Sequence, residues 1–269
     1  MWRGRGMRSK RPPYRSAAFR VLRIFGVYAA VVAIWGLTGR AGLWSGATMP
    51  APEDVFHALR VNVENGLIFD ALRVSLLRMT VGFAISFVAG TALGLLTATT
   101  KILEESLGGL VLGLQSLPSI TWLPLAVVWF GASESAIVFV VLMGSTFSIA
   151  YSAQAGVRGL PPLLSRVAGT LGATRWQSFR YVVIPAMVPS MVRGMKQGWS
   201  FAWRALMAGE LLVTAGGLGR MLDAGRRAND LSLIFAMMFV IIVVGVAVDR
   251  LIFGRAEAWV RERWGFSAG

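Results

Sequence analysis

Long apolar segments, separated by shorter polar ones, dominate the sequence. Six of them are long enough to cross a bilayer, because a hydrocarbon core of about 30 Å needs about 20 apolar residues in helical form. They lie at about residues 21–38, 71–98, 107–130, 136–155, 186–215 and 231–253. Since the bilayer core offers no water to the backbone, each segment is expected to be helical. The pattern predicts an all-α, polytopic membrane protein with six transmembrane helices.

The third apolar segment is interrupted by Pro118 and Pro124. One interpretation is a kinked helix whose freed backbone groups are satisfied by neighbouring helices. The other is a broken helix that lines a transport pathway, as interrupted helices in transporters often do. The sequence favours neither interpretation, so both prolines are candidate pathway residues.

The fifth apolar segment contains four ionisable residues, Arg193, Lys196, Arg204 and Glu210. At about 100° per residue, Ser200 falls on one helix face with Arg193 and Arg204. For Arg193 and Lys196 we favour side chains that reach the cytoplasmic headgroups. Arg204 and Glu210 lie deeper, where ionisable groups mark functional sites. We expect Arg204 to pair with another helix or subunit and to face a central pathway that attracts anions, with Ser200 and Glu210 as further pathway candidates.

The polar loop over residues 156–185 is basic and contains no acid. Short loops rich in Lys and Arg stay on the cytoplasmic side. Within this loop, Gly172 permits a sharp turn, and Thr174 is the expected N-cap of a short helix over residues 175–181. Pro185 falls in the first turn of the fifth apolar segment. Two short helices joined at a glycine suit the docking of a partner protein.

The charge distribution predicts the orientation. Of 27 Lys and Arg residues, most fall at the N-terminus, in the 156–185 loop and at the C-terminus, which places both ends in the cytoplasm. Residues 1–20 are a basic tail expected to contact anionic lipid headgroups. We interpret the first apolar segment as an uncleaved helix rather than a secretory signal, because it is long enough to span.

The composition excludes several classes of function. The chain is 55% hydrophobic, with no cysteine and one histidine, His57, so neither a disulfide framework nor a multi-histidine metal site is expected. The net charge is +14, but the basic residues lie between apolar segments rather than on one folded face, which argues against nucleic-acid binding. No P-loop, Gly-x-Ser-x-Gly or His-Glu-x-x-His motif occurs. We therefore expect neither an enzyme nor a chain that binds ATP itself.

One set of residues resembles a known family. Ala168, Gly172 and Ile184-Pro185 have the spacing of the EAA loop in inner-membrane subunits of bacterial ABC importers, with Arg166-Val167 in place of its leading Glu-Ala. The segments 115–125 (QSLPSITWLPL), 129–131 (WFG) and 171–177 (LGATRWQ) look like the nitrate/sulfonate/taurine/bicarbonate branch of these permeases. The similarity runs from about His57 to Trp264.

The resemblance implies a type I ABC importer (MetI-like) fold and a pore-forming permease subunit that works as a dimer and is not itself an enzyme. It implies a separate ABC ATPase dimer that binds ATP and Mg²⁺, a periplasmic or lipid-anchored solute-binding protein, and a small anionic solute. No cofactor or metal is expected on this chain. In family members the loop forms the coupling helix that contacts the ATPase. A Gly-Leu-Gly turn caps their pathway near the binding protein. The corresponding residues are Arg166, Val167, Ala168, Gly169, Thr170, Leu171, Gly172, Ala173 and Pro185 for coupling, and Gly217 and Gly219 for a periplasmic gate.

These inferences divide the chain into a basic tail (1–20), a first transmembrane helix with a periplasmic segment (21–70), a core permease domain (71–253) and a cytoplasmic tail (254–269). The alternative function is a stand-alone, ion-coupled secondary transporter. Such a transporter needs a coupling-ion site, usually built from intramembrane carboxylates, and normally shows internally repeated halves. Only Glu210 is available for that role, and no repeat is evident.

Overall fold

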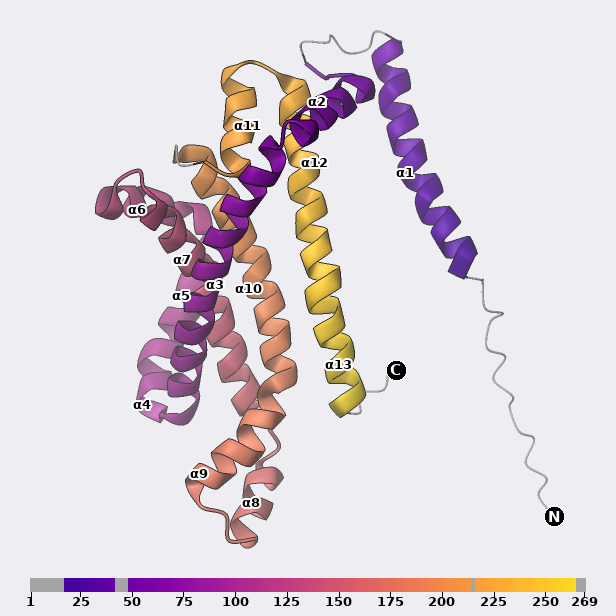
Figure 1. Cartoon of the computed structure of the whole chain (residues 1–269). Helices are drawn as coiled ribbons and strands as arrows, with labels where there is room; N and C mark the ends of the chain where they lie inside the picture. Colours follow the sequence, from indigo (N-terminus) through magenta and orange to yellow (C-terminus); the bar gives the residue numbers. More distant parts are fainter. Residues whose placement is uncertain (1–16, 42–47, 214–215, 265–269) are drawn as a thin grey trace, which may run out of the picture. The chain divides into compact units, whose positions relative to one another are not determined.

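The computed structural model describes residues 17–41, 48–213 and 216–264, and every regular element in those ranges is helical (Figure 1). In chain order the elements are α1 (Ala17–Arg40), α2 (Pro52–Glu64), α3 (Leu67–Thr99), α4 (Lys101–Leu103), η1 (Glu104–Gly108), α5 (Gly109–Ser116), η2 (Ser119–Trp122), α6 (Leu123–Phe130), α7 (Glu134–Arg158), α8 (Pro162–Thr170), α9 (Arg175–Ser178), η3 (Phe179–Val183), α10 (Ile184–Leu212), α11 (Leu218–Arg227), α12 (Leu231–Val248), η4 (Asp249–Phe253) and α13 (Gly254–Trp264). The all-α prediction is confirmed for this part of the chain.

The chain divides into two units, residues 1–56 and 57–269. The first unit contains α1 and the beginning of α2. Within it, the indole Nε1 of Trp35 donates to the carbonyl oxygen of Pro50 at 3.1 Å, and Arg40 pairs with Glu53 at 3.0 Å. The second unit contains all the remaining elements and both candidate sites described below.

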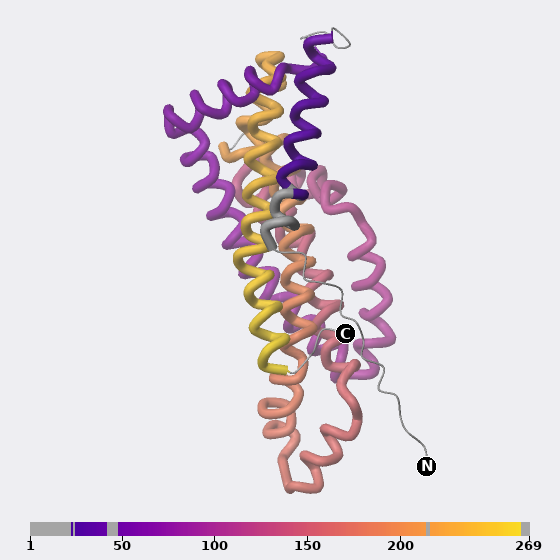
Figure 2. The backbone as a smooth tube through the Cα atoms, turned by 90° about the vertical axis from the view of Figure 1, so that its right-hand side faces the viewer, coloured from indigo at the N-terminus to yellow at the C-terminus, as the bar shows by residue number. Residues whose placement is uncertain are grey.

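Helices α3, α7 and α10 form the centre of the second unit, with α7 packed along both of the others (Figures 1 and 2). Small residues allow this close approach, as in many membrane helix pairs. A Cβ atom added at Gly90 of α3 would lie 2.6 Å from the carbonyl oxygen of Thr146 in α7. A Cβ added at Gly94 would come comparably close to the carbonyl oxygen of Ala150, and one added at Gly194 of α10 would come comparably close to the Cβ of Ser152. The backbones therefore approach more closely than alanine would permit.

A helix or a bent helix pair lies at each of the six predicted positions. Three helical stretches, Leu67–Thr99, Glu134–Arg158 and Leu231–Trp264, are individually long and apolar enough to cross a membrane. The other two helices do not meet both conditions. In α1 the stretch Phe25–Arg40 is apolar but shorter, and α10 is long enough but carries the four ionisable residues. The predicted end of the fifth segment, residue 215, lies outside the described residues, and α10 ends at Leu212.

The third segment is broken rather than kinked. The helical stretches Lys101–Ser116 and Ser119–Phe130 meet at an angle of 102°. Leu117 and Pro118 adopt extended backbone at the break, with ψ angles of 129° and 131°. Pro124 lies in the first turn of α6, where its missing N–H costs no hydrogen bond. Pro118 therefore marks the break, whereas Pro124 begins the helix that follows.

Candidate functional site

The 156–185 loop forms a helical knob, residues 162–183, which projects beyond the ends of the other helices of its unit in both views (Figures 1 and 2). Gly172 has a φ of 78°, the left-handed conformation that glycine adopts without strain, and it joins α8 to α9. The N-cap prediction for Thr174 is confirmed. Its hydroxyl accepts from the backbone N of Gln177 at 3.2 Å, while Gln177 accepts from the backbone N of Thr174 at 2.8 Å. This reciprocal capping fixes the angle at which α9 leaves the turn.

The surface of the knob is apolar and basic. Leu171, Trp176 and Tyr181 are 82%, 69% and 73% exposed, although residues of these types are usually buried. Ala168 is the buried residue of α8, and its carbonyl oxygen accepts from the backbone N of Ala173 at 3.0 Å. Arg166 and Arg175 are exposed, and neither has an acidic partner among the described residues. An exposed apolar patch with uncompensated positive charge is a surface that a partner can cover.

The predicted coupling residues lie in one continuous stretch of the knob, apart from one. Arg166 to Thr170 occupy the second half of α8, and Leu171 to Ala173 form the turn. Pro185 lies in the first turn of α10, beyond the π-helical segment η3 that connects it to α9. The short helix predicted over residues 175–181 is therefore an α-helical turn, Arg175–Ser178, followed by a π-helical one.

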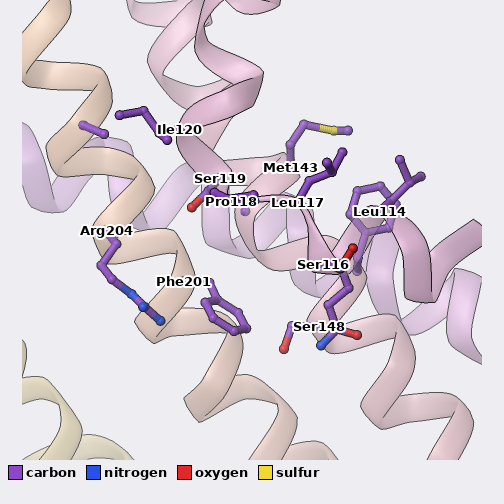
Figure 3. A pocket seen from close by; sticks show the side chains of 14 residues that line it. Leu114, Ser116, Leu117, Pro118, Ser119, Ile120, Met143, Ser148, Phe201 and Arg204 are labelled. Atoms are coloured by element: carbon purple, nitrogen blue, oxygen red, sulfur yellow. The ribbon is translucent and has the colours of Figure 1, made fainter.

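A cavity of about 540 Å³ lies where the broken third segment meets α7 and α10 (Figure 3). Figure 3 shows Arg204 and Phe201 of α10 across the cavity from the turn at residues 116–119. Of the predicted pathway residues, Arg204 and Pro118 line the cavity, and Ser200, Pro124 and Glu210 do not. Gly144 of α7 also lines the cavity, and a Cβ added there would be 3.3 Å from that of Ser119.

Arg204 is exposed and has no acidic partner in the described ranges. Its Nε donates to the carbonyl oxygen of Ser200 at 3.0 Å, and its Cζ lies 4.9 Å from the centre of the Phe201 ring. Both contacts are within α10, so the pairing with another helix that we expected for Arg204 is not found among the described residues. The guanidinium has five donors, and most of them are left for a ligand or another subunit.

Two polar groups in the cavity wall were missed by the sequence analysis. Ser148 is 1% exposed, yet its hydroxyl has no hydrogen-bond partner, and the same holds for the buried side-chain oxygen Oε1 of Gln115. Buried polar groups are nearly always paired, so these two unpaired groups stand out beside the cavity, and a ligand would reach them only if the wall moved. Each residue is a polar position within an apolar segment, which was a usable signal in the sequence.

Glu210 lies in a buried ionic cluster, the Glu210 cluster, away from that cavity. Its carboxylate accepts from Arg78 Nη1 at 2.8 Å, from the Ser75 hydroxyl at 2.8 Å and from the backbone N of Gly219 at 3.0 Å. Arg78 also donates to the carbonyl oxygen of Gly216 at 2.7 Å and pairs with Glu134. The cluster therefore joins α3, α10, the beginning of α7 and the segment before α11.

Arg78 lies in α3 at a position from which an arginine could extend to lipid headgroups, but its side chain points into the protein instead. Its side chain is 5% exposed, because two carboxylates and a carbonyl oxygen compensate its charge inside the protein. The predicted gate residues belong to the same cluster. Gly217 has a φ of 98°, and a Cβ there would overlap the Glu210 carboxylate, while one at Gly219 would lie 2.6 Å from the Cβ of Glu210. Glycine is required at both positions to bring this segment onto Glu210.

Lys196 also differs from expectation. Its Nζ lies 3.3 Å from Glu257 and 3.6 Å from Asp249, so it bridges α10 to the C-terminal helices instead of extending to headgroups. Arg193 is exposed and donates to the Ser190 hydroxyl at 3.2 Å. Among the described residues, no three His, Asp or Glu side chains gather as a metal site.

Comparisons with known proteins identify the family to which this architecture belongs. The nitrate import permease NrtB of Synechocystis is 26% identical over 257 residues, covering 92% of each chain, and the taurine transport permease TauC of Escherichia coli is 24% identical, covering 83% of each. The MetNI methionine ABC transporter superposes with a TM-score of 0.62 at 19% identity, over 72% of this chain and 96% of that one, and shows the type I ABC importer (MetI-like) fold. The family model described as binding-protein-dependent transport system inner membrane component matches residues 90–255. The chain therefore belongs to the family of binding-protein-dependent transport system inner membrane components, in the branch that includes the nitrate and taurine permeases.

Proposed function

We propose that this permease carries a small anion, of the nitrate, sulfonate, taurine or bicarbonate class, along a pathway that passes Arg204. The observation that carries the proposal is an exposed arginine without an acidic partner in a cavity at the break of a membrane helix. A charge within a membrane segment is costly unless it faces water, a ligand or a partner. A guanidinium without a counter-ion raises the local concentration of anions and binds oxoanions through paired donors.

The other polar groups of the cavity support a solute that accepts and donates hydrogen bonds. If the wall moves to expose them, the Ser148 hydroxyl can donate to an oxyanion, and the Gln115 side-chain oxygen can accept from an amino group such as that of taurine. Phe201 and Leu117 supply apolar surface against an alkyl chain. The cavity is formed by one chain, and we propose that a second permease subunit, in a homodimer, completes the pathway.

Energy for transport is proposed to come from a separate ABC ATPase dimer, which binds ATP and Mg²⁺. The exposed side chains of the knob would be covered by a groove of that ATPase, and its uncompensated arginines favour an acidic rim there. Because the turn at Gly172 and the capping box at Thr174 together set the angle between α8 and α9, the knob can transmit a rigid-body movement. The result would be alternating access between two faces of the membrane.

Orientation follows from the same proposal. The knob and both termini would lie in the cytoplasm of a bacterium whose inner membrane the chain spans, and the first helix would precede a periplasmic segment. The Glu210 cluster would then hold the Gly217–Gly219 segment at the periplasmic end, where a periplasmic or lipid-anchored binding protein delivers the solute. The division into a basic tail, a first helix, a core permease domain and a C-terminal tail stays part of this proposal.

The alternative, a secondary transporter coupled through Glu210, has little support in these contacts. A coupling carboxylate must exchange its cation or proton during each cycle. The Glu210 carboxylate is instead held by Arg78, Ser75 and Gly219, and it is 1% exposed.

Arg204→Gln tests the proposed pathway. Proteoliposomes containing the permease, its ATPase and the loaded binding protein are assayed for uptake of labelled nitrate, taurine, ethanesulfonate and bicarbonate. Loss of a charge-assisted hydrogen bond of about 1.5–3 kcal/mol predicts a fall in uptake of at least about tenfold for whichever anion the wild type carries. Arg204→Lys should retain part of the activity, and Arg255→Gln, an exposed arginine of α13, should retain all of it. Normal uptake by Arg204→Gln would remove Arg204 from the pathway.

A further inference from the structure

A second basic cavity lies between α10 and α13, apart from the one that contains Arg204. Its volume is about 340 Å³, and it is lined by Pro189, Val192, Arg193, Glu257, Val260 and Arg261. Arg193 and Arg204 are eleven residues apart on α10, which corresponds to about 16 Å along the helix at 1.5 Å per residue. The two cavities are therefore separate sites on one helix.

The lining of this second cavity carries a net positive charge. Arg193 and Arg261 are both exposed, and neither has an acidic partner among the described residues. The one acid in the described lining of this cavity, Glu257, is paired with Lys196 at 3.3 Å and with neither arginine, so two arginines face a single carboxylate and the lining keeps a net positive charge. Arg193 uses one of its five donors on the Ser190 hydroxyl, which leaves the rest for a ligand.

The walls of the cavity are held in place from both sides. The indole Nε1 of Trp264 in α13 donates to the carbonyl oxygen of Pro185 in α10 at 3.1 Å, and the Lys196–Glu257 pair crosses between the same helices. Val260, which also lines the cavity, is buried. Because the helices are tied together at two points, the two guanidinium groups are presented on fixed backbones, which lowers the entropy lost on binding.

We propose that Arg193 and Arg261 bind an oxoanion with the chemistry of a phosphate group. Guanidinium groups match the spacing of phosphate oxygens through paired N–H donors. The anion could be the phosphate of a phospholipid headgroup or a free oxoanion. An interfacial position is supported by neighbouring Trp259, 51% exposed, whose ring packs against Trp264 and under the guanidinium of Arg263. Tryptophan and arginine together mark the membrane–water interface.

The test uses the purified full-length chain in dodecyl maltoside, without ATPase or binding protein, so that its outcome is independent of the proposed transport function. Binding is measured by native mass spectrometry with phosphatidylglycerol or phosphatidylcholine, and by thermal unfolding with inorganic phosphate. The variants are Arg193→Gln, Arg261→Gln and the double variant. Arg255→Gln is the matched control, because it removes the same charge from an exposed position of α13 outside the cavity.

Each cavity variant should weaken binding of the anionic probe about tenfold, the effect of one charge-assisted hydrogen bond, while Arg255→Gln leaves it unchanged. Loss confined to phosphatidylglycerol identifies the lipid as the ligand, and loss confined to inorganic phosphate identifies a free anion. Loss with both probes identifies one site that either can fill. If the double variant binds both probes as tightly as Arg255→Gln does, the proposal is overturned.

Glu257→Gln provides a test of opposite sign that does not depend on the arginine variants folding. It removes the acid of the cavity wall, while Lys196 keeps its pair with Asp249 and the hydrogen bond from Trp264 to Pro185 still ties α13 to α10, so anion binding should become several-fold tighter. Unchanged or weaker binding by Glu257→Gln would contradict an electrostatic anion site between α10 and α13.

Discussion

Within the described structure, the Glu210 cluster is where the loss of a single side chain is expected to lower the stability of the fold most. Removing both charges of a buried ion pair can be nearly neutral, whereas removing one partner leaves the other charge buried and uncompensated. Glu210 and Arg78 lie 132 residues apart in the chain and belong to different helices, so no local pattern connects them. The sequence identified Glu210 as unusual, and only the folded chain supplies its partner.

Arg78→Gln should therefore lower the free energy of unfolding by about 3 kcal/mol, because it leaves the buried Glu210 carboxylate without a compensating charge. The control is Arg73→Gln, which removes the same charge from an exposed position of the same helix, and little change is expected there. Unfolding is followed by circular dichroism as sodium dodecyl sulfate replaces a neutral detergent. Equal stability of the two variants would show that the Glu210–Arg78 pair does not stabilise the fold.

Elements were predictable where periodicity and turn chemistry act locally. The apolar runs located the spanning segments, and Gly172 and Thr174 located the turn of the knob because their backbone preferences are intrinsic. Two outcomes depend on tertiary packing and were not predictable. Pro118 could kink or break its helix, and the choice is made by α7 and α10, which pack against η2. The unpaired Ser148 hydroxyl likewise depends on which face of α7 meets the break.

Helix α11 should lose stability in acid. The hydrogen bond from Arg226, with help from Arg227, lowers the pKa of Asp223 below its ordinary value. A lowered pKa in the folded state gives stability that is complete above the ordinary aspartate pKa, near 4, and that is lost as the pH falls through the lowered value. We expect amide exchange in α11, normalised for intrinsic rate, to rise at low pH in the wild type. Asp223→Asn should exchange faster at neutral pH and lose this pH dependence; the same profile in both proteins would contradict the assignment.

At the scale of the whole molecule, the second unit combines a packed three-helix centre with the cavity at Arg204 and the exposed knob. The packing of α3, α7 and α10 through glycines fixes the distance between these features. Similarity to importer permeases establishes the family. The exposure of Leu171, Trp176 and Tyr181 is accounted for by the docking that we propose. In the account proposed here, those side chains are buried by an ATPase, and the cavity is completed by a second subunit.

The most direct test of this account is co-purification of a P-loop ATPase with the tagged, detergent-solubilised permease. Gly172→Val removes the left-handed turn, because a β-branched residue is a strong outlier at a φ of 78°, whereas Gly172→Asn is a matched control that tolerates this conformation. We predict that the ATPase co-purifies with the wild type and with Gly172→Asn, and that it is lost with Gly172→Val. If no ATPase accompanies the wild type, or if Gly172→Val retains it fully, coupling through the knob is contradicted.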